Sequence, residues 1–444
     1  MTSSLISIAS SGAAAASAAL AITAQNIANA STDGYVRRGI NLTSLSSTNS
    51  FSSSGEISQL GVQVTGITRN VDSFLQSEAR RTNSDAMRSD TLVSGLTNVD
   101  NSLESSGVYT SITSFQTALS QLTANPTDSS LRANFLASAT TMAQSFNVAH
   151  NSLASAVSGL QQSATDGVTQ VNQLAQNLAQ INKNIVSDND PNNNGATLLD
   201  QRDTILRQLS QYGDITTTIG ADNTVQVQMG GASGPSLVSG GTASTLASTT
   251  AADGTMSLTL GGSALTLSGG SLAGQQQTLV SAATAKTTLD TIATAMMTTV
   301  NTAQTSGVDL TGATGTAMFS GTGAGGMTVA ITNASKIATA PAGAAANSLD
   351  SSNLTTLQSG LSTANVAGQM NDLLFSTSSA VAGATTTQTA LDAIASSAKT
   401  SLASQSGVNL DTEAANLLQY QQAFQASGKV LQTAETLFNQ LLQL

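Results

Sequence analysis

Apolar side chains repeat every three or four residues over the first segment of the chain, residues 4–30, and this spacing predicts a helix. Two such series run along it. One contains Leu5, Ile8 and Ile22, and the other contains Ile27. Because the two series lie on different faces and many side chains between them are small, we expect a helix that is buried on two sides and closely approached by its neighbours.

Helical spacing continues after a short interruption. Turn-forming residues at 29–34 end the first helix, and the weak alternation over 35–67 predicts extended chain with loops. The spacing returns over 72–120 and again, after Asn125-Pro126, over about 128–187, where Asp128 supplies a cap. A helix near 60 residues is typical of an elongated, coiled-coil-like bundle.

The clearest strand-like alternation lies in the middle of the chain. A short helix at about 197–210 is followed by alternation over 215–229 and 256–267, which predicts two hairpins. We interpret residues 211–345 as a β-rich insert with a helix near 274–304. Helical spacing resumes at about 353 and, after a break near 404–408, continues to the last residue.

These patterns predict a mainly α fold with a β-rich inserted domain. The simplest arrangement is an elongated, discontinuous helical rod built from both chain ends. Three parts are expected: an inner assembly domain in which residues 1–34 pair with 408–444, a long-helix rod from 35–210 with 346–407, and an outer insert of 211–345.

The last helix carries the clearest pattern. Read as a heptad from Leu410, it has apolar residues at eight of its ten a and d positions. Burying the five large a side chains would contribute on the order of 7–15 kcal/mol, and ordering the backbone costs roughly 1–2 kcal/mol per residue, so the helix needs a partner. Either the first helix or a second copy can supply it, and an ordinary core stripe of the monomer remains the alternative. The expected assembly residues here are Leu410, Leu417, Tyr420, Phe424, Leu431, Ala434, Phe438 and Leu441.

Composition narrows the function classes. The chain has 25 acidic and 14 basic residues, a net charge of −11, one histidine and no cysteine. This balance disfavours nucleic acid and polybasic membrane attachment, and it excludes disulfides, thiolate nucleophiles and multi-histidine metal sites. No run of about 18 consecutive apolar residues predicts a membrane span. The uncharged N-terminal segment also lacks the basic region of a cleaved signal peptide.

The candidate cofactor-binding and metal-binding motifs lack the neighbouring residues that their chemistry requires. Gly321–Gly326 matches a dinucleotide-binding pattern but is followed by a strand-like segment rather than a helix. Asp188, Asp190 and Asn192 have calcium-loop spacing without the required glycine and glutamate. The charged residues of 198–203 read as structural partners. We therefore expect no enzyme, no cofactor and no metal site.

Several motifs resemble those of a known family. Residues 24–37 resemble the N-terminal signature of flagellar axial proteins. Residues 198–203, 270–274, 307–312 and 406–434 are similar, in order, to landmarks of flagellar hook-associated protein 1, the junction protein between hook and filament. The positions that carry the N-terminal likeness are Asn26, Asn29, Gly34, Tyr35 and Arg37.

This resemblance implies a structural subunit of the bacterial flagellum whose terminal helices order on assembly. It implies an extracellular location after type III export without a cleaved signal peptide. The implied partners are identical copies, hook protein, a second hook-filament junction protein, the filament cap or flagellin, and an export chaperone. The chain is short for the family. A hook or distal-rod protein, or a type III-exported adhesin or effector, remains an alternative.

Overall fold

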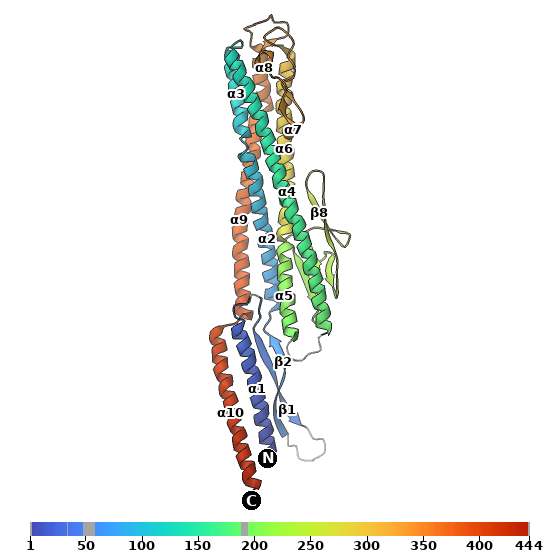
Figure 1. Cartoon of the computed structure of the whole chain (residues 1–444), viewed down its shortest axis with the longest axis vertical. Coiled ribbons are helices and arrows are strands. Elements are labelled where there is room, and N and C mark those ends of the chain that lie inside the picture. Colours follow the sequence, from blue (N-terminus) through green and yellow to red (C-terminus); the bar gives the residue numbers. More distant parts are fainter. Residues whose placement is uncertain (1, 33, 48–57, 188–193, 443–444) are drawn as a thin grey trace. The chain divides into compact units, whose positions relative to one another are not determined.

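The computed structural model describes residues 2–32, 34–47, 58–187 and 194–442 (Figure 1). Its contacts divide the chain into two compact units, each built from segments distant in sequence. The first unit is Met1–Ser84 with Val171–Thr245 and Asp392–Leu444, and the second is Asp85–Gln170 with Leu246–Leu391. Helices dominate and the sheets are small, which confirms the predicted mainly α fold with a β-containing insert.

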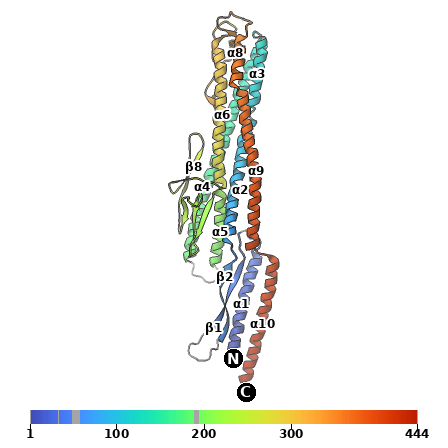
Figure 2. The same ribbon diagram turned by 180° about the vertical axis from the view of Figure 1, so that it is seen from behind.

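The first unit holds both chain ends. Helix α1 (Thr2–Ala28) lies beside α10 (Leu410–Leu442) in both views (Figures 1 and 2), and strands β1 (Arg38–Ser47) and β2 (Ser58–Arg69) form an antiparallel hairpin. The hairpin agrees with the extended chain predicted over 35–67. The unit also contains α5 (Asn194–Tyr212) and parts of α2 (Ser73–Glu104), α4 (Ser129–Ser187) and α9 (Val366–Ser406).

A four-stranded antiparallel sheet packs against α4 within this unit. Its buried face includes Val225, Val227 and Met229. The amide of Asn182 on α4 donates to the carbonyls of Val225 and Gly240 and accepts the N–H of Val225, so it binds two strand ends to the helix. The strands, in sheet order, are β3 (Ile215–Ile219), β4 (Val225–Met229), β5 (Ser236–Ser239) and β6 (Thr242–Ala243).

The second unit is a helical bundle with a continuous apolar core. The rings of Phe115 and Phe135 lie 4.7 Å apart between centroids, and Phe319 packs beside Phe115. The unit's remaining helices are α3 (Val108–Ala124), α6 (Gly270–Ser306), α7 (Gly323–Gly326), the 3-10 turn η1 (Ala334–Lys336) and α8 (Ser352–Ala364). Its strands are β7 (Leu246–Thr250), β8 (Met256–Leu260), β9 (Ser263–Leu265), β10 (Gly307–Val308), β11 (Phe319–Ser320), β12 (Thr328–Val329) and β13 (Ala340–Pro341).

Most predicted elements are confirmed. Helix α4 begins one residue after Asp128, whose Oδ1 accepts the N–H groups of Ser130 and Leu131 as an N-terminal cap. Both predicted hairpins form, as β3–β4 and β8–β9. The predicted helix near 274–304 is α6, which starts four residues earlier.

Two predicted helical segments are each divided in the structure. The segment from about 353 to 404 is divided between α8 and α9 at Asn365, which has φ 46°. The segment 72–120 is not a single helix, because α2 ends at Glu104 and α3 begins at Val108. Gly107 between them has φ 65°, the left-handed conformation that glycine adopts without a side-chain penalty and that ends helices. The loop of Asp188, Asp190 and Asn192 lies outside the described residues, and the three-part domain division stays a prediction.

Candidate assembly site at the chain ends

Helix α1 is covered on two sides, by α10 and by the β1–β2 hairpin, as Figures 1 and 2 show. Small residues bring these elements close together. A Cβ on Gly12 would lie 3.1 Å from the Ser427 hydroxyl of α10, and one on Gly61 of β2 would overlap Ser11 of α1. We call α1, α10 and this hairpin the candidate assembly site.

The heptad of α10 divides between two faces. Two of its d positions, Glu413 and Ala434, are each 2% exposed. The large a residues Leu410, Phe424 and Phe438 are instead 54%, 45% and 46% exposed. Helix α10 therefore packs within the chain through its small and polar d residues and leaves its largest apolar residues open.

The other predicted assembly residues are distributed as follows. Ile22 is buried, and Leu5 and Ile8 are exposed. Those that are half-buried are Ile27, Leu417, Tyr420 and Leu431. The side chain of Leu441 lies outside the described residues. The assignment of this set to assembly stays a prediction.

Asn26 is the centre of a buried hydrogen-bond network that joins the two chain ends. Its Nδ2 donates to the Arg38 carbonyl at 2.8 Å and to Glu413 Oε2 on α10 at 3.1 Å. Its Oδ1 accepts the Tyr35 hydroxyl at 2.9 Å and the Arg38 N–H at 3.0 Å. Burial raises the pKa of Tyr35 despite the nearby Arg38 guanidinium, so the hydroxyl keeps the proton that it donates.

The remaining motif residues shape the turn after α1. The Asn29 amide donates to the Gln25 carbonyl, and its oxygen accepts the Thr32 hydroxyl. Gly34 has φ 81°, and a Cβ there would lie 2.7 Å from the Thr204 hydroxyl of α5. The Arg37 N–H donates to the carbonyl of Ser406, where α9 ends. The N-terminal motif is thus a structural connection between the terminal helices and their neighbours.

Charged side chains fasten the hairpin to α5. Arg38 and Arg69 both reach Asp200 at 2.7 Å, and Arg69 also reaches Asp203 at 2.7 Å. Burial raises the pKa of Asp203, but attraction to Arg202 and Arg69 outweighs it and holds the pKa below its ordinary value. The structural interpretation of residues 198–203 fits this arrangement.

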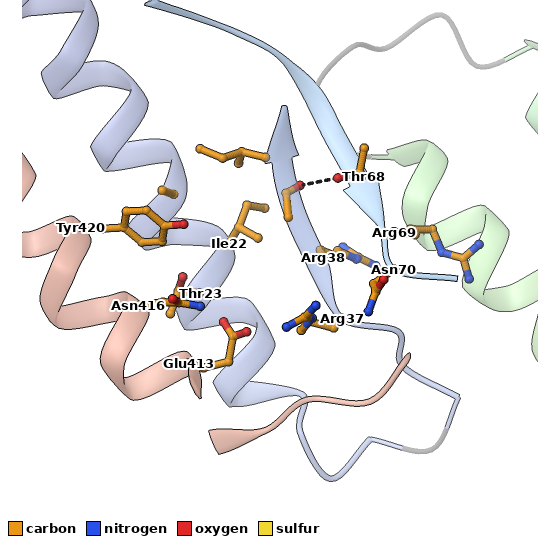
Figure 3. A pocket seen from close by; sticks show the side chains of 13 residues that line it. Ile22, Thr23, Arg37, Arg38, Thr68, Arg69, Asn70, Glu413, Asn416 and Tyr420 are labelled. Atoms are coloured by element: carbon orange, nitrogen blue, oxygen red, sulfur yellow. Dashed lines mark hydrogen bonds between the residues drawn. The ribbon is translucent and has the colours of Figure 1, made fainter. Parts of the chain in front are cut away.

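A polar cavity of about 270 Å³ opens among α1, the hairpin and α10. Figure 3 shows Arg37, Glu413 and Tyr420 lining it. Within the described part of the chain, no group of three or more acidic or histidine side chains is placed to hold a metal ion.

One described helix segment, Leu5–Ala28, is long and apolar enough to cross a membrane by length and composition. The sequence contains no unbroken apolar run of that length, because polar residues interrupt it throughout. In the structure this helix buries Asn26 in the network described above and packs against α10 and the hairpin.

Sequence reasoning missed Glu413 as a partner of the N-terminal motif. Its hydrogen bond to Asn26 spans 387 positions of sequence. The available signal was the charge itself, because a glutamate at a d position in a mostly apolar heptad requires a buried polar partner.

Comparisons with known proteins agree with this architecture. A family described as flagella basal body rod protein matches residues 6–35, and one described as flagellar basal body rod FlgEFG protein C-terminal matches residues 401–444. Paired ends of this kind define a bacterial flagellar axial protein. The helical domain of flagellar hook-associated protein FlgK matches residues 93–319, more than half of the chain, and the chain belongs to that family.

Two individual relatives are both named flagellar hook-associated protein 1. Flagellar hook-associated protein 1 of Bacillus subtilis is 32% identical over 206 residues, covering 45% of this chain and 40% of the relative. Its namesake in Salmonella typhimurium is 30% identical over 256 residues, covering 55% and 44%. The solved flagellar hook junction protein FlgK from Burkholderia pseudomallei matches with TM-score 0.50 and 25% identity, covering 55% and 46%. The matched stretch thus spans less than half of each relative.

Proposed function

We propose that this chain is a non-enzymatic structural subunit of the bacterial flagellum that forms the junction between hook and filament. It assembles with identical copies through its terminal helices. Hook protein on one side, and a second junction protein with the filament cap or flagellin on the other, are its neighbours. Family membership and the relatives named for hook association support this proposal.

One structural observation carries the assembly mechanism. Helix α10 packs on α1 through small and polar residues and leaves Leu410, Phe424 and Phe438 about half exposed. The a positions between them, Leu417 and Leu431, are half-buried, and an apolar face of this kind is unusual for a surface that meets only water. Covering each of these side chains against another copy would contribute roughly 1 kcal/mol, half the value for full burial.

The alternatives have less support. Hook and distal-rod proteins are mainly β between their terminal helices, whereas this chain is mainly α there. The relatives named above are hook-associated or hook junction proteins, and none of them is named as an adhesin or effector. We further propose export without a cleaved leader and delivery by a chaperone, following the family resemblance.

The decisive experiment substitutes Phe424, whose side chain is exposed in the chain. In a strain lacking the gene, complementation with Phe424→Asp should give intact hooks and filament protein lost to the medium, because the new charge resists burial between copies. Gln422→Asp adds the same charge at another exposed position of α10 and should restore filaments. Swimming, electron microscopy of hooks and the filament protein in the medium are the measurements.

Circular dichroism of both purified variants should match that of the unmodified chain. Normal filaments on Phe424→Asp cells would refute the assignment of this face to assembly. Failure of the unmodified gene to restore filaments would refute the junction function itself.

A further inference from the structure

The face of α1 that packs against α10 does little to fix the register of the two helices. Helix α1 contains no charged residue, and its buried positions are mostly alanine, including Ala9, Ala15 and Ala19. Such a surface is nearly smooth along the helix axis. Packing alone therefore distinguishes poorly between neighbouring alignments of the two helices.

Two contacts define the alignment that the structure adopts. Near the middle of the pair Gly12 meets Ser427, and near the start of α10 Asn26 binds Glu413. From Gly12 to Asn26 and from Glu413 to Ser427 there are 14 residues in each helix, which is two heptads. The helices are antiparallel and keep one constant register between these points.

The heptad of α10 permits other registers. A slip by one heptad moves the helix about 10 Å along its axis and returns the same face to α1. Gly12 would then face Tyr420 or Ala434 instead of Ser427. Both are d positions, so the apolar pattern does not forbid the slip.

The buried pair of Asn26 and Glu413 does forbid a slip of one heptad. Glu413 is 2% exposed and Asn26 is 1% exposed, and the Asn26 amide already uses both of its groups on Glu413, Tyr35 and the Arg38 backbone. After a slip of one heptad toward the start of α1, Glu413 would lie opposite Ala19, which has no side-chain donor. A buried carboxylate that loses its hydrogen-bond donor is strongly disfavoured.

We propose that the Asn26–Glu413 pair sets the register of α1 on α10. By fixing this register, the pair also decides which residues of α10 lie level with those of a second copy, a consequence that rests on the proposed function. Asn26 and Glu413 are positioning residues in this respect, in the way that a single buried polar residue fixes the register of a coiled coil.

Because the chain has no cysteine, engineered pairs report the register directly. Gly12→Cys combined with Ser427→Cys reads the native register, since the Gly12 Cβ position lies 3.1 Å from the Ser427 Oγ. Gly12→Cys with Tyr420→Cys, or with Ala434→Cys, reads the two slipped registers. Each full-length pair is equilibrated in a glutathione buffer, and the intramolecular disulfide is quantified by mass spectrometry.

With the polar pair intact, the native disulfide should be favoured over either slipped one by at least about tenfold, as expected for a hydrogen bond to a charged group. In the Asn26→Leu, Glu413→Leu double variant the preference should fall to within about threefold. Packing alone then remains between the two helices, since the Arg37 N–H to Ser406 carbonyl bond holds the end of α9 and not α10 itself. Glu413→Gln should retain the preference, because its side-chain carbonyl still accepts from Asn26 Nδ2.

An unchanged native preference in the double variant would overturn the proposal. So would a loss of all three disulfides together with loss of helical circular dichroism, since the pair would then serve folding and not register. If Glu413→Gln lost the preference for the native disulfide as completely as the double variant does, that result would also overturn the proposal. All disulfides form within one chain, so these outcomes are independent of whether Phe424→Asp abolishes assembly.

Discussion

At the scale of single residues, several buried polar side chains of this protein bind backbone groups that are distant in sequence. Arg132 on α4 is 1% exposed, and its guanidinium donates to the carbonyls of Pro126, Ala334, Ser335 and Ile337. It thereby fixes a segment more than 200 positions away along the chain. The sequence pattern gives no sign of this role, because one arginine in a helix does not reveal which distant carbonyls it will meet.

Replacing Arg132 should therefore destabilise the second unit. Arg132→Leu leaves several buried carbonyls without a donor, which costs roughly 3 kcal/mol or more. The midpoint of urea unfolding, followed by circular dichroism, should fall accordingly. Arg81→Leu removes an arginine whose side chain is 60% exposed, and it should change the midpoint little. Equal effects of the two variants would contradict this role.

Asp309 gives the same unit an acid-sensitive contact. Burial raises its pKa, but hydrogen bonds from Thr311, Lys336 and Ala313 outweigh this and lower the pKa to about 2. Because the folded pKa lies below the ordinary value of 3.8, this stabilisation is complete above about pH 4. It is lost as the pH falls from there toward 2.

Asp309→Asn should accordingly be less stable than the unmodified chain at pH 6, by about 1.5–3 kcal/mol. The difference in thermal midpoint should shrink as the pH is lowered to 2.5. Asp166→Asn, which changes an exposed carboxylate of α4, is the matched control and should show no such convergence. A constant gap between Asp309→Asn and the unmodified chain at every pH would contradict the assignment.

At the scale of elements, helices and hairpins were predictable where their period ran for many residues. The 59-residue α4 and the β3–β4 hairpin were both found in this way. The break between α2 and α3 was not, because only three residues interrupt the pattern and the helical spacing continues across them. A glycine in the left-handed conformation decides that break, and its conformation is not visible in the apolar pattern.

The approach of β2 to α1 depends on another glycine. A Cβ at Gly61 would overlap the Ser11 hydroxyl and lie 3.2 Å from the Ile8 backbone. Gly61→Ala should therefore displace the hairpin from α1 and lower the free energy of unfolding by about 1–3 kcal/mol. Hydrogen exchange of the β1 and β2 amides should accelerate. Gly39→Ala in β1 meets only an ordinary contact with Thr68 at 3.5 Å and should leave exchange unchanged. Similar rates in both variants would refute the close approach.

At the scale of the whole chain, the sequence predicted two apolar terminal helices but not which face of each is covered. The heptad identifies both a and d positions as apolar, and it does not say that the d face meets α1 while Leu410 and Phe424 remain open. That choice follows from contacts distant in sequence, chiefly Gly12 with Ser427 and Asn26 with Glu413. A one-dimensional period contains no information about such contacts.

This distribution of burial predicts where the chain is least stable. Helix α10 has few buried side chains, whereas Phe115, Phe135 and Phe319 are almost fully enclosed in the second unit. Local stability follows buried apolar contact, so amides of α10 in a dilute, isolated sample should exchange faster than those around Phe115.

Assembly should change this order. When copies cover the row of Leu410, Phe424 and Phe438, exchange along α10 should slow by at least about tenfold, which corresponds to about 1.4 kcal/mol of added local stability. Amides around Phe115 should not change, because their contacts lie within one chain. Hydrogen exchange with mass spectrometry on isolated and assembled protein tests both statements. If α10 already exchanged as slowly as the Phe115 core in the dilute sample, its exposed row would have no stability to gain from another copy, and the assembly mechanism would fail.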